Sequence, residues 1–193
     1  MTSWRGSAQI VNGKWACIAW VLISATVLAL PARGEVKDVS ASGFTLENSV
    51  VVPLDAAIAW QALVGSVDSW WPKDHTWWGR DSRLTIDARA GGCFCEMAGE
   101  RQAQHLQVVF VDPPRLLRMI GGLGPLQGMG LSGVLECRVA AVDGGTRITF
   151  WYRAGGYTPN DLSKLATVVD GVQALQLGGL ADYLRAHNPK PHP

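Results

Sequence analysis

Between residues 82 and 153 nearly every segment carries a β-strand pattern, and one long helical pattern then ends the chain. The strand-like runs are separated by turns, of which Asp112-Pro113-Pro114 and Asp143-Gly144-Gly145 have the clearest turn chemistry. From Asp161 to His187 apolar residues recur at helical spacing, and Asn160 is the expected N-cap. Strands joined by short turns form an antiparallel meander, and a single amphipathic helix must bury its apolar stripe against it. The order therefore predicts an α+β fold.

Before the meander we expect one strand over 39–52 and two short helices over 54–64 and 67–71. Pro53 suits the start of the first helix, where its missing N–H has no partner to lose. Pro72 ends the second helix. The later strands are expected over 84–88, 92–97, 103–111, 116–120, 131–142 and 147–153, with Ile148, Phe150 and Tyr152 sharing one face. The prediction is a curved antiparallel sheet of about seven strands that wraps the C-terminal helix and encloses a space.

The first 34 residues have the layout of a secretory signal. Arg5 and Lys14 precede the uncharged apolar run Trp15–Leu30, and small residues at Ala32 and Gly34 offer cleavage after either position. The run is shorter than the roughly 20 residues of a transmembrane helix. We therefore expect a signal peptide over 1–34 and a periplasmic or secreted domain over 35–193. The alternative is a membrane anchor over residues 15–30, the only part expected to touch a membrane.

Charge limits the partners of the exported part. The full chain of 193 residues has 17 basic and 16 acidic side chains, and the first 34 residues contain three of the basic and none of the acidic ones. The remaining 159 residues thus have 14 basic against 16 acidic side chains. Nucleic-acid binders show a basic excess or stripe, which this balance lacks. The length fits a single domain with a sizeable core.

The stretch Ser69–Gly79 gathers four of the nine tryptophans of the chain. They are Trp70, Trp71, Trp77 and Trp78, and each buried ring is worth up to about 4–6 kcal/mol. Adjacent pairs do not share one face of a helix or strand. These rings are expected either to form a packed structural corner or to wall a cavity that accepts an apolar guest.

Three residues are candidates for acid–base chemistry. His75 lies inside the tryptophan stretch and is either a general acid/base or a structural hydrogen-bonding group. Glu96 and His105 are expected roughly opposite each other on adjacent strands, where a carboxylate can orient the imidazole. The more apolar face is expected to turn to the core, and it consists of Cys93, Cys95, Met97, Leu106, Val108 and Phe110. Glu96 and His105 would then face solvent, unless a register slip reverses the two faces.

The exported part keeps an odd number of cysteines, Cys93, Cys95 and Cys137. Cys93 and Cys95 share one face of a strand, and a disulfide between them is expected to be strained. A metal pair is disfavoured because structural zinc sites use wider spacing and four ligands. We expect small apolar core residues, with a bridge from Cys137 to one of the others as the alternative.

The chain resembles the SRPBCC superfamily (START/Bet v 1-like), in its polyketide cyclase-like and Hsp90-activator-like branch. The resemblance runs from about Gly43 to Arg185 and is carried by Val50-Val51-Val52-Pro53-Leu54, Ala59-Trp60, Trp70-Trp71-Pro72, Ala90-Gly91-Gly92-Cys93-Phe94-Cys95-Glu96, Val111-Asp112-Pro113-Pro114-Arg115-Leu116-Leu117 and Gly144-Gly145-Thr146-Arg147-Ile148-Thr149. It implies a helix-grip fold with a hydrophobic cavity between the sheet and the C-terminal helix. It does not imply one reaction, and the exported N-terminus argues against an Hsp90 partner.

The glycine-rich loop Gly121–Gly130 looks like an apolar lid, because it carries Leu126 and Met129 but no phosphate-binding motif. The other candidate ligand contacts are Phe94, Arg118, Tyr152 and Tyr157. We expect an exported binding protein for a small hydrophobic or aromatic ligand such as a lipid, sterol or polyketide-like molecule. The alternatives are a cyclase- or hydrolase-type enzyme using the same cavity and an envelope interaction module with a filled core. No cofactor or metal is expected.

Overall fold

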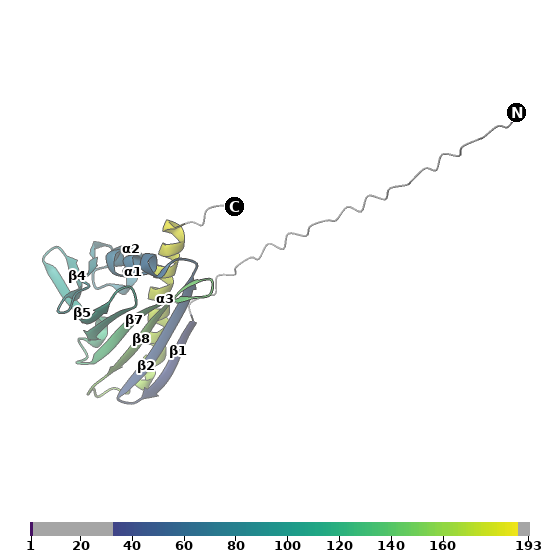
Figure 1. The fold of residues 1–193 in the computed structure, drawn as a ribbon. Coiled ribbons are helices and arrows are strands. Elements are labelled where there is room, and N and C mark those ends of the chain that lie inside the picture. The colour runs from purple at the N-terminus through teal and green to yellow at the C-terminus, as the bar shows by residue number, and fades with distance from the viewer. Residues whose placement is uncertain (2–32, 189–193) are drawn as a thin grey trace.

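The computed structural model describes Met1 and residues 33–188. Its centre is an eight-stranded antiparallel sheet in the order β1-β2-β8-β7-β6-β5-β4-β3, curved around one long helix, α3 (Figure 1). The strands are β1 (Arg33–Ser40), β2 (Gly43–Val52), β3 (Arg83–Ile86), β4 (Cys93–Ala98), β5 (Arg101–Asp112), β6 (Leu116–Gly121), β7 (Ser132–Val142) and β8 (Gly145–Gly155). The helices are α1 (Ala56–Gly65), α2 (Val67–Trp70) and α3 (Ser163–His187), with 3-10 turns η1 (Lys73–His75), η2 (Gly79–Asp81) and η3 (Gly124–Leu126). The predicted α+β class is confirmed, with eight strands in place of about seven.

The added strand comes from a hairpin at the start of the domain. The single strand expected over 39–52 is two strands, because the chain turns at Ala41-Ser42 and pairs Ser40 with Gly43. The Ser40 hydroxyl donates to the carbonyl of Gly43 at 3.2 Å across this turn. β1 is largely exposed, so it lacks the apolar alternation that identifies a strand in sequence.

The expected signal peptide falls almost wholly on residues 2–32, which lie outside the described residues. Its last two positions, Arg33 and Gly34, pair with β2 in the sheet. Export and the alternative anchor over 15–30 therefore stay predictions. Within residues 33–188, no helix has both the length and the apolar character needed to cross a membrane.

The C-terminal helix begins two residues later than expected. Its N-cap is Leu162, without a side-chain cap, so Asn160 does not have the predicted role. Asp161 instead accepts a hydrogen bond from the Ser163 amide at 3.0 Å. The helix packs against β1, β2, α1 and α2. Because α3 covers β1 and β2, the space above the other strands must be closed by loops.

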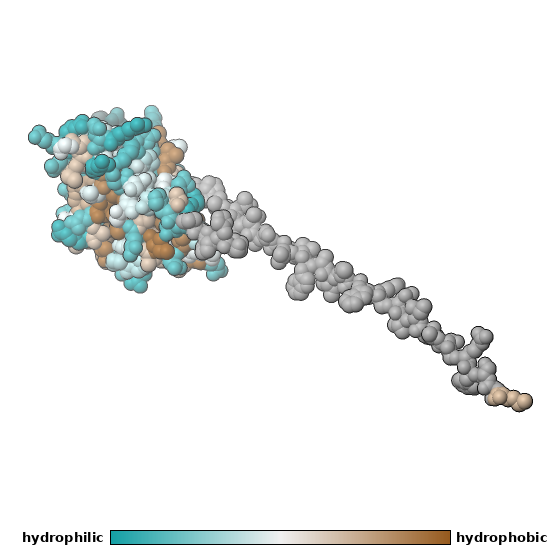
Figure 2. All heavy atoms as spheres, turned by 90° about the horizontal axis from the view of Figure 1, so that it is seen from above, coloured by the Kyte–Doolittle hydropathy of each residue, from teal (hydrophilic) through white to brown (hydrophobic). Residues whose placement is uncertain are grey.

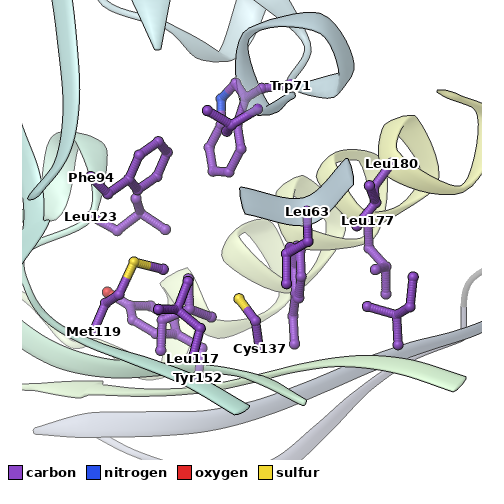
Figure 3. Close-up of a cluster of buried hydrophobic side chains, with 14 of the residues drawn as sticks. Leu63, Trp71, Phe94, Leu117, Met119, Leu123, Cys137, Tyr152, Leu177 and Leu180 are labelled. Carbon is purple, nitrogen blue, oxygen red and sulfur yellow. The ribbon is translucent and has the colours of Figure 1, made fainter. Parts of the chain in front are cut away.

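Apolar side chains of the sheet, α1 and α3 meet in the interior (Figure 3). Ile148, Phe150 and Tyr152 share one face of β8, as predicted, and this face is buried in the core. Figure 3 shows Trp71 entering from above, toward Phe94 and Leu123 and opposite the sheet residues. On the outer surface seen in Figure 2, apolar residues form separate patches among hydrophilic ones.

Two of the three cysteines depart from expectation, and Cys137 does not. A disulfide joins Cys93 and Cys95, where we expected free core thiols. Alternate residues of a strand project to the same side, and their Cα atoms lie 5.4 Å apart, within the usual span of a disulfide. Cys137 is free and buried, and burial raises the pKa of its thiol well above the ordinary value.

Candidate functional site

A cavity of about 370 Å³ lies between the sheet, α3, η3 and the tryptophan loop, residues Ser69–Gly79. Its walls are mainly apolar and include Trp71, Trp77, Leu123, Pro125, Leu126, Met129, Leu165, Val168, Val169 and Val172. Polar side chains reach it from several elements, namely Asp74, His75, Thr76, His105, Tyr152, Gln173 and Gln176. Ligand sites of small molecules combine an apolar wall with a few placed polar groups, at roughly 300–1,000 Å³. This cavity has that composition at the small end of the range.

His105 and Glu96 form a buried hydrogen-bonded pair at one wall. Nε2 of His105 lies 2.8 Å from Oε2 of Glu96, and the side chains are 7% and 0% exposed. The pair faces inward, so the expectation that both residues face solvent is wrong. Phe94, Glu96 and Ala98 are the buried face of β4, whereas Met97 is 40% exposed.

A β-bulge in β5 explains the reversal. Phe94 pairs with Leu106, but Cys95 pairs with Gln104, so His105 is an extra residue in the ladder. Such a residue breaks the alternation of faces. His105 and Leu106 are therefore both buried, although they are neighbours on one strand. Regular alternation from the sequence could not place both inside.

Glu96 is held by three further donors. Oε1 accepts hydrogen bonds from the Ser82 hydroxyl at 2.6 Å and from the main-chain amides of Trp77 at 2.8 Å and Trp78 at 3.3 Å. All of these groups belong to the end of the tryptophan loop and the start of β3. One carboxyl group thus ties the loop to the sheet and, through its other oxygen, orients His105.

The hydrogen bond to Glu96 determines which ring nitrogen of His105 carries the proton. An ionised carboxylate only accepts, so with Glu96 ionised Nε2 of His105 is the donor toward Oε2. In a neutral imidazole the second nitrogen is then an acceptor. Among the described residues Nδ1 of His105 has no partner, and it is not sealed off by protein. His105 lines the cavity, so this nitrogen is the ring atom left for a bound molecule.

Other polar atoms of residues that line the cavity are buried without a partner in the part of the chain that the structure describes. They are both amide atoms of Gln173, Nδ1 of His75 and the hydroxyl of Tyr152. Burial raises the pKa of Tyr152 to about 12. The Leu123 main chain offsets part of this shift, but within residues 33–188 no group stands in hydrogen-bond geometry to the hydroxyl. Buried polar groups without partners are destabilising, and their gathering at one cavity is a frequent mark of a ligand site.

Two of the four clustered tryptophans border the cavity. Trp71 is 7% exposed and lines it, as does Trp77, which is 46% exposed. Trp70 lies in the core instead, where its indole donates to the Ala62 carbonyl at 3.0 Å. Trp78 lies outside the cavity, with the guanidinium of Arg101 5.3 Å from its ring. In each adjacent pair, one ring lines the cavity and the other does not.

Of the other predicted ligand contacts, some line the cavity and others do not. Tyr152, Leu126 and Met129 line the cavity, and η3 forms inside the glycine-rich loop that was expected to close it. Phe94 is buried behind Trp71, with ring centroids 5.1 Å apart, and does not line the cavity. Tyr157 is 91% exposed and away from it.

Arg118 lies on the outer face of the sheet, because its neighbours Leu117 and Met119 point inward. It donates to Glu136 at 2.6 Å, and Arg138 holds the other oxygen of that carboxylate at 2.8 Å. Burial alone would raise the pKa of Glu136, but these two hydrogen bonds outweigh it and leave the pKa below the ordinary value. Arg118 is thus a structural ion-pair residue rather than a cavity contact.

His75 borders the cavity and is also tied into its loop. Its amide donates to the Pro72 carbonyl at 3.0 Å, and its carbonyl accepts from the Trp71 indole at 3.1 Å. The structure is thus consistent with both interpretations of His75, as a structural group of the loop and as a general acid/base at the cavity.

Gln173 and Gln176 were missed by the sequence analysis. Both are buried on α3, at 1% and 4% exposed. They interrupt the apolar stripe that includes Val172 and Leu180. A glutamine at a core position of a helix is a detectable signal, since buried amides need partners.

The site has the parts for binding and for proton transfer. An imidazole oriented by a carboxylate can accept a proton from a bound group. Within residues 33–188 no three His, Cys, Asp or Glu side chains come together in the manner of a metal site.

No family model matches the chain, and no curated protein matches it. Its fold is similar to several solved structures. A protein from Rhodobacter sphaeroides has a TM-score of 0.54 and 16% identity, over 80% of this chain and 99% of that one. CalU16 from Micromonospora echinospora has a TM-score of 0.53 and 13% identity, over 81% and 86%. A protein from Mesorhizobium loti has a TM-score of 0.54 and 15% identity, over 74% and 97%. These likenesses concern the fold, a sheet with a C-terminal helix that is consistent with the helix-grip type.

Proposed function

We propose that the protein is an exported binding protein for a compact, largely apolar molecule held between the sheet and α3. The observation that carries the proposal is the cavity itself, a mainly apolar space that Gln173, Tyr152 and His75 also line, with polar atoms that have no partner among the described residues. A guest would fill the space, and a small rotation of these side chains would let its polar groups supply the missing partners. A volume of about 370 Å³ favours a compact ring system over a sterol or a long-chain lipid.

Membership of the SRPBCC superfamily belongs to the same proposal. The helix-grip type of fold, the cavity beside the C-terminal helix and the motifs at Gly91–Glu96 and Asp112–Pro114 support it. A filled core would favour the interaction-module alternative, and the open cavity speaks against that alternative.

Binding is tested with naphthalene and 1-naphthol, by native mass spectrometry and by quenching of tryptophan fluorescence. We expect one guest per chain and saturable quenching. Trp77→Phe should reduce the quenching because Trp77 lines the cavity, whereas the matched variant Trp78→Phe should not. Absence of both a bound mass and saturable quenching would contradict the proposal.

The Glu96–His105 pair favours a second function, an acid–base enzyme of the hydrolase or cyclase type. Nδ1 of His105 would take a proton from water or from a substrate hydroxyl, with Glu96 fixing the ring. Hydrolysis of 1-naphthyl acetate tests this function. His105→Gln should lower the rate by roughly 10²–10⁴-fold. Equal rates for the two proteins would exclude His105 as the base for this ester.

A further inference from the structure

We propose that the guest carries a hydroxyl group that donates a hydrogen bond to Nδ1 of His105, an inference that rests on the proposed binding function. His105 lines the cavity, and in its neutral ring Nδ1 is an acceptor when Nε2 donates to Glu96. Specificity is therefore set by a residue that never touches the guest. Glu96 is a positioning residue, and His105 is the contact.

Charge at the cavity disfavours an anionic guest. Among the described residues that line it there is no lysine or arginine, whereas the exposed Asp74 is present. Glu96 adds a second carboxyl group directly behind His105. A carboxylate or phosphate would thus lose its hydration without gaining a permanently charged cationic partner. The polar part of the guest is accordingly a neutral group, such as a phenol or an alcohol.

A second polar contact with the guest would come from Gln173 on α3 or Tyr152 on β8, which line the cavity from opposite sides. Among the described residues the amide atoms of Gln173 and the hydroxyl of Tyr152 have no partner, and a small side-chain rotation would be needed to bring these sealed atoms to the guest. Such groups discriminate strongly, because a guest that fails to pair with them leaves them buried and unsatisfied. A hydroxylated ring with one further polar substituent matches this set, and a plain hydrocarbon does not.

The orientation of the imidazole can be inverted by one substitution. In Glu96→Gln the amide oxygen can still accept from Ser82 and Trp77, which places the NH₂ group against Nε2 of His105. Nε2 must then be the acceptor, and Nδ1 carries the proton. The nitrogen at the cavity changes from acceptor to donor without any change in its position. Glu100→Gln, on the exposed β4–β5 turn, is the matched control.

The experiment compares 1-naphthol, which donates and accepts, with 1-methoxynaphthalene, which only accepts, and with naphthalene. In the wild type and in Glu100→Gln we expect 1-naphthol to bind about tenfold more tightly than the methyl ether. In Glu96→Gln the ratio of the two affinities should fall to about one, or the methyl ether should bind more tightly than 1-naphthol. A purely steric exclusion of the methyl group would persist in the variant, which separates it from hydrogen bonding.

The tautomer is read independently from the ring ¹⁵N shifts of the guest-free protein. Nδ1 of His105 should be unprotonated in the wild type and protonated in Glu96→Gln. Naphthalene binding with equal affinities for 1-naphthol and its ether would overturn the inference and leave the binding function intact. Failure of all three compounds to bind would overturn the binding function and the inference with it. A protonated Nδ1 in the wild type at neutral pH would also overturn the inference.

Discussion

Nε2 of His105 lies 2.8 Å from Oε2 of Glu96, although the two residues are not partners in the β4–β5 ladder. Glu96 pairs with Ala103, and the bulge at His105 turns the imidazole inward beside it. The same carboxyl group holds the amides of Trp77 and Trp78. One buried side chain thus links the sheet, the tryptophan loop and the cavity wall, so its loss should affect stability and binding together.

Glu96→Ala is expected to be strongly destabilising. It leaves the Ser82 hydroxyl, two loop amides and the His105 ring without their acceptor in a site that is closed to solvent. Breaking a buried, hydrogen-bonded pair costs about 3–5 kcal/mol of unfolding free energy. Urea unfolding monitored by circular dichroism measures the loss. Glu100→Ala, on an exposed turn, should change the free energy of unfolding by less than about 0.5 kcal/mol. A similar small effect for Glu96→Ala would show that the network is not a structural anchor.

The sequence allowed most strands to be predicted but not the facing of this pair. Strand positions follow from alternation and from turns such as Asp143-Gly144-Gly145, which are local properties. The bulge at His105 depends on which arrangement best buries Phe94 and Leu106, which is a property of the whole core. Counting from the turn therefore placed both chemical residues on the wrong side. β1 was missed for a related reason, since an exposed edge strand carries little apolar pattern.

Gln173→Leu should stabilise the guest-free protein. Both amide atoms of Gln173 are buried with no partner among the described residues, and leucine has a similar volume with no polar atoms to satisfy. Removing such a penalty is expected to raise the free energy of unfolding by about 1–3 kcal/mol. Gln176→Leu is the control, because the polar atoms of Gln176 are not sealed from solvent and the gain should be smaller. The measurement is thermal unfolding without ligand. A loss of stability in Gln173→Leu would mean that its amide is satisfied in solution.

Asp68 should make the protein sensitive to acid. Burial by itself would raise the pKa of Asp68, but hydrogen bonds from the Lys73 ammonium and the Leu84 amide outweigh it and lower the pKa. Because the folded pKa lies below the unfolded value of about 3.9, the stabilisation is present above that pH and is lost as the pH falls through the folded pKa.

Asp68→Asn is therefore expected to be less stable than the wild type at pH 7, with a difference that shrinks toward pH 3. Urea unfolding at pH 7 and at pH 3 measures the difference in the free energy of unfolding between the variant and the wild type. Asp143→Asn, on the exposed β7–β8 turn, should show no such pH-dependent difference. If Asp68→Asn lowers the free energy of unfolding by the same amount at both pH values, its effect is not linked to ionisation of Asp68.

Two adjacent glycines of α3 should respond in opposite directions to alanine. A Cβ on Gly179 would meet the backbone carbonyl of Trp70, which cannot move without shifting α2, whereas a Cβ on Gly178 meets nothing within 4 Å. Gly178→Ala should thus gain up to about 1 kcal/mol of helix propensity. Gly179→Ala should lose about 1–3 kcal/mol through overpacking. Because both substitutions add the same methyl group to the same helix, their difference in urea midpoint reports the contact between α3 and α2. Equal midpoints would mean that the two helices separate in solution, which would also loosen the wall that Trp71 gives to the cavity.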